Sequence, residues 1–289
     1  MAADFAPLWV AYEAGIFRKV GVGVQLKSLT GLAGPAALIA GDIQIDVTGG
    51  PSVLGPIANG ADVAVVGTFV PVYPYKLEVP PSIKRKEDLV GKKIGITSFG
   101  TASDVAARAA LQKIGLAPDK DVSIVQVGST AARLAALEKG EIQGTVGEPV
   151  DTVVLEAQGF HPLFDLAALN LPAAQGVIAA RRSWLSANRG AMQAFMDAWV
   201  GATALMKKDR KLTTGVLTKY LKKGNRQAVE ASYDYFVGHV FPLRPLPKAE
   251  QFADAIYWLG KRDRKIAALD AHKFIDASFV ENVSSAAAR

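Results

Sequence analysis

Hydrophobic and polar positions follow two different patterns along this chain. In the first 180 residues, short runs rich in β-branched residues are bounded by turn residues, at 63–70, 92–98 and 122–128. Between and after them lie segments with apolar residues three and four positions apart, at 103–114, 130–138 and 149–157. The two patterns predict strands that alternate with helices, which is typical of α/β units with parallel sheets.

Beyond Ser183 the pattern predicts helices only. Four amphipathic segments follow one another, "RGAMQAFMDAWVGATALMKKD", "TTGVLTKYLKK", "RQAVEASYDYFVGHV" and "KAEQFADAIYWLGKR". Their apolar residues recur with the helical period, and no strand-like run separates them. The chain is therefore expected to end in a helical tail.

Two segments of the chain repeat one another. Residues 37–47 read "ALIAGDIQIDV" and residues 136–146 read "ALEKGEIQGTV", so that Ala, Leu, Gly, an acid, Ile, Gln and Val recur in register. Gly41 and Gly140 occupy the position where the end of a helix favours a positive φ. One supersecondary unit repeated at this distance predicts two similar lobes.

Composition narrows the class of protein. The chain has 289 residues, of which 50% are hydrophobic and 21% charged, and it contains no cysteine. This length suits two globular domains, and the lack of cysteine excludes disulfides and thiolate chemistry. No apolar run approaches the roughly 20 residues that a membrane span needs. Met1 leads directly into "AADFAPLWVAYEAG", so no signal sequence is expected within this chain.

Positive charge is concentrated in one block. Residues 181–226 hold 11 basic and 2 acidic side chains, whereas residues 1–180 hold 14 basic and 17 acidic ones. Such a block raises the question of nucleic-acid binding. Its lysines fall mainly on one side of amphipathic helices, so we interpret it as a solvated helix face and predict no nucleic-acid partner.

Four segments carry a resemblance to a known family. They are "APLWVAYEAGIFRKVGVGVQL" from Ala6, "IKRKEDLVGKKIGITSFGTAS" from Ile83, "ALEKGEIQGTVGEP" from Ala136 and "GVIAARRSWLSANRGAMQAFMDAWVGA" from Gly176. Together they resemble the periplasmic substrate-binding proteins of ABC importers. The most similar branch is the sulfonate/nitrate/taurine and thiamine-precursor group, or NMT1/THI5-like family.

The resemblance implies the type 2 periplasmic-binding-protein fold. In this α/β fold, two lobes each contain a sheet flanked by helices, two crossover strands join them, and a helical tail follows. Lobe 1 is then expected at residues 1–75 and 177–289, and lobe 2 at residues 76–176. The crossovers are expected near 75–79 and 175–179.

The start of the chain departs from the family pattern. Residues 6–26 resemble the first helix and the second strand of the family, but family members usually have one more strand just before the Phe5 region. This chain has no room for that strand. Either the chain is truncated or its start is misassigned, and lobe 1 then lacks a central strand or another strand fills its place.

The candidate site follows from the strand ends. Ligands of doubly wound sheets bind at the carboxyl ends of strands, where helix N-termini point. The stretch "GITSFGTASD" from Gly95 ends a strand and begins a helix, so its N–H groups and hydroxyls predict a seat for an anion or a carbonyl. Equivalent strand ends complete the predicted ligand-binding set, which is Phe5, Leu8, Trp9, Thr48, Gly49, Gly50, Pro51, Thr68, Phe69, Ser98, Phe99, Thr101, Ala102, Ser103, Gly147 and Glu148.

Several members of this set have a second interpretation. The hydroxyls of Thr101 and Ser103 equally suit a helix cap, and each aromatic side chain suits the core better than the wall of a pocket. Glu148 has three interpretations: it accepts from a ligand, clamps the lobes through a lysine or arginine, or caps a helix before Pro149. Arg108 and Arg133 lie a turn or more beyond the strand ends, so anion binding would rest on amides and hydroxyls.

No pattern of residues indicates catalysis. His161, His239 and His272 are scattered, and neither a metal-binding spacing nor a G-x-S-x-G motif occurs. The sequence predicts no catalytic residue, metal or cofactor. The predicted function is a periplasmic, monomeric solute-binding protein without stable membrane insertion. It would capture a small polar or anionic organic ligand and deliver it to an ABC transporter permease.

Two other classes of function stay open. The first is a biosynthetic enzyme on the same scaffold, resembling those of thiamine or menaquinone synthesis. A thiamine-type enzyme would want a cysteine-rich iron motif, and a menaquinone-type enzyme would want a catalytic acid or histidine, for which only Glu148 is placed. The second is a sensory domain, which is usually fused to a membrane or signalling module.

Overall fold

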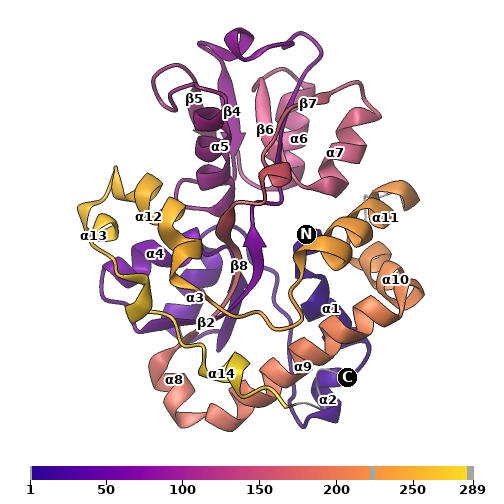
Figure 1. Cartoon of the computed structure of the whole chain (residues 1–289), viewed down its shortest axis with the longest axis vertical. Helices are drawn as coiled ribbons and strands as arrows, with labels where there is room; N and C mark the ends of the chain where they lie inside the picture. Colours follow the sequence, from indigo (N-terminus) through magenta and orange to yellow (C-terminus); the bar gives the residue numbers. More distant parts are fainter. Residues whose placement is uncertain (1, 222–224, 285–289) are drawn as a thin grey trace.

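The computed structural model describes residues 2–221 and 225–284, and it contains two lobes (Figure 1). Lys222 and Lys223 of the predicted basic block lie outside the described residues. We call the unit built on the three-stranded sheet lobe 1 and the unit built on the five-stranded sheet lobe 2. Of the described helices, none is long and apolar enough to cross a membrane.

Lobe 2 contains a sheet of parallel and antiparallel strands, with helices on both of its faces. Its strands occur in the order β5-β4-β6-β3-β7 and span β3 Lys76–Val79, β4 Lys93–Ile96, β5 Ser123–Gln126, β6 Gly144–Gly147 and β7 His161–Asp165. Its longer helices are α5 Ala102–Lys113, α6 Thr130–Glu138 and α7 Pro149–Glu156. β4 pairs in parallel with β5 and β6, whereas β3 runs antiparallel to both of its neighbours.

Lobe 1 has a sheet with the order β1-β8-β2. The strands are β1 Ile45–Thr48, β2 Val63–Val72 and β8 Pro172–Arg181, and the helices before them or between them are α1 Ala6–Glu13, α2 Ile16–Lys19, α3 Ala33–Ala40 and α4 Pro51–Ala58. β8 pairs antiparallel with both β1 and β2. The prediction of a parallel sheet is therefore wrong for this lobe, because β8 returns from lobe 2 and enters the sheet in the opposite direction.

The predicted second strand of lobe 1 does not form. Residues 22–30 belong to no helix or strand, and β1 has β8 as its one partner within the described sheet. β1 is thus an edge strand, and no backbone hydrogen bond within the described residues joins it to 22–30. The other edge is covered, because Val65 exchanges hydrogen bonds with Phe274 and Asp276 of the tail.

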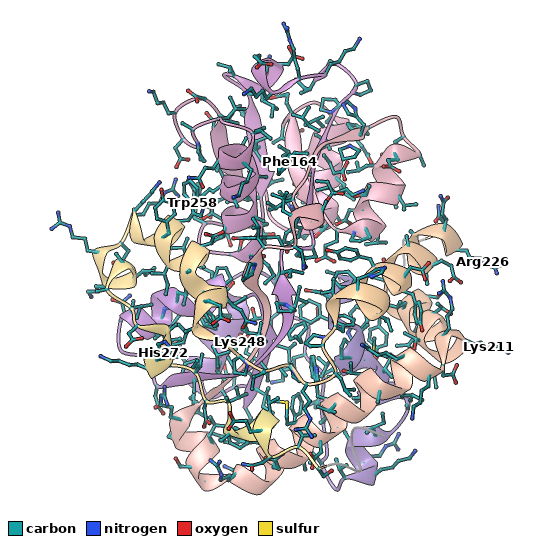
Figure 2. All side chains as sticks on the ribbon, viewed as in Figure 1. Phe164, Lys211, Arg226, Lys248, Trp258 and His272 are labelled. Atoms are coloured by element: carbon teal, nitrogen blue, oxygen red, sulfur yellow. The ribbon has the colours of Figure 1, made fainter. Side chains whose placement is uncertain are left out.

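The helical tail predicted beyond Ser183 is confirmed. Its helices are α8 Arg182–Ala187, α9 Arg189–Lys208, α10 Arg210–Leu221, α11 Arg226–Tyr235, α12 Ala253–Gly260, α13 Arg264–Ala267 and α14 Ser278–Glu281. α9 packs against α1, whereas α11 reaches α7 and α12 reaches α5 of lobe 2 (Figure 1). Lys211 and Arg226 point outward from the tail (Figure 2), as expected of a solvated helix face.

The repeated unit has the same local structure in both lobes. α3 leads through Gly41 into β1, and α6 leads through Gly140 into β6. Both glycines have a positive φ, 89° and 73°, which residues with a side chain rarely adopt. The predicted lobe limits stay a prediction; every strand of the five-stranded sheet falls inside 76–176, and β8 begins before residue 177.

Candidate functional site

The strand ends predicted to share a site face one another. A Cβ atom added to Gly49 at the end of β1 would lie 2.9 Å from the Cβ of Ala102 at the start of α5. One added to Gly31 would lie 3.3 Å from Ser98 Oγ. A Cβ on Gly50 would collide with the carbonyl oxygen of Ala174. These glycines permit close contact between protein segments, and at Gly31 and Gly49 the two segments belong to different lobes.

The turn before α5 satisfies most of its own N–H groups. Ser103 Oγ accepts from the Thr97 N–H at 2.9 Å, and Asp104 Oδ2 accepts from the Gly100 N–H at 2.9 Å. The Thr101 hydroxyl donates to the Ser98 carbonyl at 2.7 Å, and Thr101 holds the N-cap position of α5. The small polar residues of this turn therefore fold the turn itself, and a carboxylate already lies at the helix N-terminus.

The predicted aromatic residues divide between the core and the surface. Trp9 and Phe69 are 4% and 1% exposed, and they pack on Tyr220 and Trp199 with ring centroids 4.7 and 5.0 Å apart. Both rings belong to the core of lobe 1. Phe5 is partly buried at the edge of that core, whereas Phe99 is exposed.

Three carboxyl groups and one guanidinium meet where the lobes join. Asp4 precedes α1 in lobe 1, and Glu148 and Asp151 lie at the N-terminus of α7 in lobe 2. Glu148 faces the charge of Asp4 and the backbone of Ala3, so the two lobes meet at this point. We call Asp4, Glu148, Asp151 and Arg133 the acidic cluster.

Glu148 holds the N-cap position of α7, directly before Pro149. Its own N–H donates to Asp151 Oδ2 at 3.1 Å. The helix-cap interpretation of Glu148 is therefore confirmed for its backbone. Its side chain is 4% exposed, and Oε2 has no hydrogen-bond partner in the part of the chain that the structure describes.

Arg133 reaches further than its place in the sequence suggests. From the first turn of α6 its Nη1 donates to Thr145 Oγ1 at 2.9 Å and to the Val146 carbonyl at 2.8 Å, and its Nη2 donates to Thr130 Oγ1 at 3.1 Å. The side chain is buried and its charge faces Glu148 and Asp151. Arg133 lies on a helix beyond the strand end, as predicted, but its side chain reaches back to β6.

Burial and mutual repulsion set the protonation of the cluster. Burial raises the pKa of Asp4 to about 7. Burial, followed by the charges of Asp4 and Asp151, raises the pKa of Glu148 well above its ordinary value. Burial also raises the pKa of Asp151, against the attraction of Arg133. At neutral pH the cluster therefore binds protons that free carboxylates would release.

Two further groups extend the cluster. The pKa of Tyr75, between β2 and β3, is raised well above its ordinary value by burial and then by the charges of Glu148 and Asp4. Burial raises the pKa of Glu78 on β3 to about 7, although Thr152 Oγ1 donates to its Oε1 at 2.5 Å. Glu78 therefore adds a fourth carboxyl close to Asp151, with its Oε2 unpaired among the described groups.

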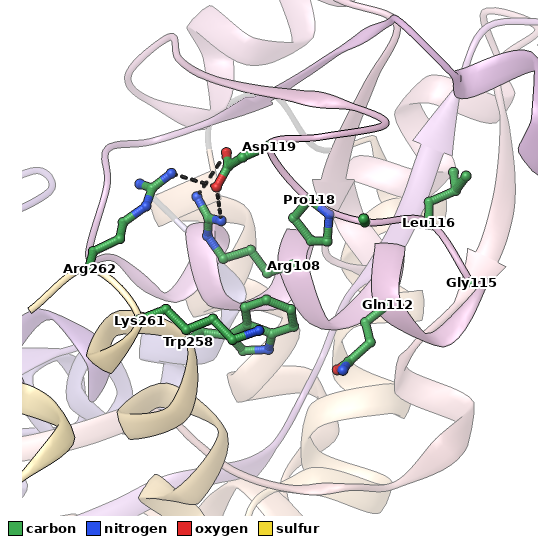
Figure 3. Close-up of a pocket in the computed structure, with 10 residues that line it drawn as sticks. Arg108, Gln112, Gly115, Leu116, Pro118, Asp119, Trp258, Lys261 and Arg262 are labelled. Carbon is green, nitrogen blue, oxygen red and sulfur yellow. Dashed lines mark hydrogen bonds and ion pairs between the residues drawn. The ribbon is translucent and has the colours of Figure 1, made fainter.

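A second junction between the lobes lies at the outer end of α5. A hollow of about 560 Å³ separates α5 from the end of α12, and Asp119 and Arg262 meet above it (Figure 3). Arg262 Nη2 lies 2.7 Å from Asp119 Oδ2, and its guanidinium covers the Phe99 ring at 4.6 Å. We call Arg262, Asp119 and Phe99 the outer latch.

Sequence reasoning found one member of the acidic cluster and missed three. Glu148 was found through the Glu-Pro pair after a strand. Asp151 had a signal, because an acid three residues after an N-cap residue is typical of a capping box. Asp4 and Arg133 had none, since their surroundings come from segments distant in the sequence. Within the described residues, no group of three or more His, Cys, Asp or Glu side chains is placed to hold a metal ion.

Comparison with known proteins gives one family and many similar structures. A family model described as NMT1/THI5 like matches residues 2–211. A search of curated protein sequences returned no match.

The solved structures share the fold at low sequence identity. The periplasmic aliphatic sulphonate binding protein SsuA from Escherichia coli is 21% identical, with a TM-score of 0.76 over 97% of each chain. The periplasmic nitrate-binding protein NrtA from Synechocystis PCC 6803 is 17% identical, with a TM-score of 0.75 over 98% of this chain and 86% of the other. A mutant of DSZB in complex with biphenyl-2-sulfinic acid is 16% identical, with a TM-score of 0.72 over 96% of this chain and 95% of the other.

Proposed function

The chain belongs to the NMT1/THI5-like family, and from this premise we propose that it is a solute-binding protein of an ABC importer. It captures a small molecule between its lobes in the periplasm and delivers it, as a monomer, to the membrane permease. The observation that carries the proposal is the junction where Asp4 of one lobe meets Glu148 of the other, with buried polar atoms that no described residue pairs. Buried polar groups of this kind cost free energy unless a partner supplies hydrogen bonds.

Capture requires the lobes to move. We propose that residues 1–75 and 177–289 move against residues 76–176, with the hinge at the segment around Tyr75 and at the start of β8. Hinge closure of this kind is a known response to ligands. The ligand-binding set is then the partly exposed strand ends, Thr48, Gly49, Ser98 and Ala102, together with Phe5 and Leu8 at the edge of the core.

The test is native mass spectrometry of the purified protein, followed by denaturation and extraction of any small molecule that it carries. Small-angle X-ray scattering before and after removal of that molecule measures closure. A small molecule that is returned unchanged and that reduces the radius of gyration supports the proposal. Protein that carries no molecule, and that keeps one radius of gyration with every added solute, contradicts it.

A second function rests on the raised pKa of Glu148. Burial that raises the pKa of a carboxyl group brings it toward the range in which a general acid works. An enzyme on the same scaffold is therefore the alternative, and the same extraction separates the two. If the protein converts the molecule that it carries, and Glu148→Gln abolishes this conversion, the enzyme is favoured over the importer component.

A further inference from the structure

We propose that the junction between the lobes binds a small organic cation, whose protonated nitrogen donates hydrogen bonds to the carboxylates of Asp4 and Glu148. This inference rests on the proposed function and names the class of ligand. It excludes the sulfonates, nitrate and carboxylates that a basic site would take. Four features of the described residues carry it.

The first feature is the charge of the acidic cluster. Asp4, Glu148 and Asp151 bring three carboxyl groups to one place, and among the described side chains the basic group that faces them is Arg133. Glu78 adds another carboxyl group, which lies close to Lys76 as well as to Asp151. The raised pKa values mean that bound protons offset part of this negative charge in the free protein. A cation would take the place of those protons, whereas an anionic ligand would be repelled by every carboxyl group that ionises.

The second feature is a pair of buried acceptors without donors. Asp4 is 9% exposed and Glu148 is 4% exposed. Asp4 Oδ1 and Glu148 Oε2 accept no hydrogen bond from any group in the described ranges. They belong to different lobes, and each carboxyl group lies within the electrostatic field of the other. A ligand that donates to both would join the lobes through these atoms.

The third feature is the use of the Arg133 donors inside the protein. Both of its Nη atoms already donate to Thr145, Val146 and Thr130. Two parallel N–H groups that point at one acceptor are what a sulfonate or carboxylate needs from an arginine. Three of the five Arg133 N–H groups instead hold α6 against β6, and Nε is its one nitrogen without a hydrogen bond among the described groups.

The fourth feature is the carboxylate at the N-terminus of α5. The helix end that would otherwise attract an anion already has Asp104, which accepts from the Gly100 N–H. Asp104 is fully buried and pairs with Arg108 at 2.7 Å. The anion seat predicted at this turn is thus filled by a side chain of the protein itself.

The experiment compares ligands of equal size and opposite charge. Benzylammonium and benzamidinium are titrated against benzoate and benzenesulfonate at millimolar concentrations, by thermal shift and by isothermal calorimetry. We expect the cations to bind at least about tenfold more tightly than the anions, because each carboxylate accepts a charge-assisted hydrogen bond. Equal or tighter binding of the anions, or no response to either cation, would overturn the inference.

Two variants locate the binding. Glu148→Gln and Asp4→Asn keep the shape of the side chain and should each weaken cation binding about tenfold or more. Glu138→Gln, on the exposed end of α6, is the matched control and should leave the affinity unchanged. Urea unfolding of each variant shows that it is folded. Unchanged cation affinity in both cluster variants would overturn the inference.

Failure of this inference is distinguishable from failure of the proposed function. If an anion binds and scattering shows that it closes the lobes, the proposed solute-binding function is supported and the cation inference is wrong. If the protein neither carries nor binds any small molecule, both are wrong.

Discussion

The lobes meet at two junctions with opposite electrostatic character. In the acidic cluster, one guanidinium faces three carboxyl groups, and the pKa values of those carboxyls are raised. In the outer latch, Asp119 lies between Arg108 and Arg262, 2.6 and 2.7 Å from their nitrogens. Burial opposes the ionisation of Asp119, but hydrogen bonds from Arg108 and then Arg262 outweigh it and lower its pKa.

From this difference we expect the two junctions to contribute to the proposed closure in different ways. The latch is charge-matched, and the side chains of Asp119 and Arg262 are 41% and 42% exposed, so water screens its attraction. The acidic cluster is buried, so each unpaired charge there is costly. If the lobes close around a ligand as proposed, we expect the latch to align them and the neutralisation of the cluster to decide whether they stay closed.

The largest expected effect comes from removing the one cation of the cluster. Arg133→Met should lower the free energy of unfolding by about 3–5 kcal/mol, because it removes the positive charge that faces the buried carboxyl groups and leaves the Val146 carbonyl without its Arg133 donor. Urea unfolding followed by circular dichroism measures it. Arg85→Met, on a side chain that is 75% exposed, is the control. If Arg133→Met lowers the free energy of unfolding no more than Arg85→Met does, the charge of Arg133 does not stabilise the buried carboxyl groups.

The next effect depends on pH. The pKa of Asp4 is about 7 in the folded protein against 3.8 as its ordinary value, so its contribution to stability is fully present below about pH 4 and is lost as the pH rises through 7. The groups that face it are Glu148, Asp151 and Tyr75. Asp4→Asn should therefore gain up to about 4 kcal/mol over the native protein above neutral pH, and almost nothing in acid.

The measurement for Asp4 is urea unfolding across a pH series. Asp42→Asn is the control, because Asp42 is exposed. A gain for Asp4→Asn that is the same in acid and in base would contradict the raised pKa.

A smaller effect should follow from a methyl group between the lobes. Gly49→Ala places a Cβ atom 2.9 Å from the Cβ of Ala102, so closure would need a shift that costs about 1–2 kcal/mol, or about tenfold in ligand affinity. The double variant Gly49→Ala/Ala102→Gly removes the collision and should restore binding. Calorimetry with the extracted ligand measures both, and a double variant that is no better than the single one would place the strain elsewhere.

The smallest effect is expected at the latch. Arg262→Met removes the ion pair with Asp119 and the contact with Phe99, which together contribute less than about 1 kcal/mol at an exposed site. Stability should hardly change, whereas the radius of gyration of the ligand-free protein should rise. High salt should mimic the variant. A stability loss as large as that of Arg133→Met would show that the two junctions are equivalent.

Local sequence patterns were sufficient for most helices and strands. α6 spans the predicted residues 130–138, and the turns at Gly41 and Gly140 have the φ values that their position predicts. The direction of β8 and the coil at 22–30 were not predictable, because both depend on which strands are present as neighbours. Pairing of strands is a tertiary property, whereas helical periodicity is local.

The candidate site also has a part that local sequence predicts and a part that depends on tertiary structure. Glu148 could be predicted from the strand, acid and proline around it. The role of Arg133 could not, since its acceptors Thr145 and Val146 lie on β6 and no spacing rule links them to α6. The serines and threonine at 98–103 lie at the start of α5, but the hydroxyls of Thr101 and Ser103 bond to the Ser98 carbonyl and the Thr97 N–H of the same turn.

The position of β8 has a consequence for the order in which the two lobes fold during synthesis. β1 and β2 are not hydrogen-bonded to each other, and β8 joins them from the middle. On the ribosome, the first lobe therefore has no sheet until residue 181 has emerged, by which time the whole five-stranded sheet has already been synthesised. Lobe 2 is continuous in sequence and can therefore fold first. The sheet of lobe 1 forms afterwards, when β8, which follows lobe 2 in the chain, pairs with β1 and β2.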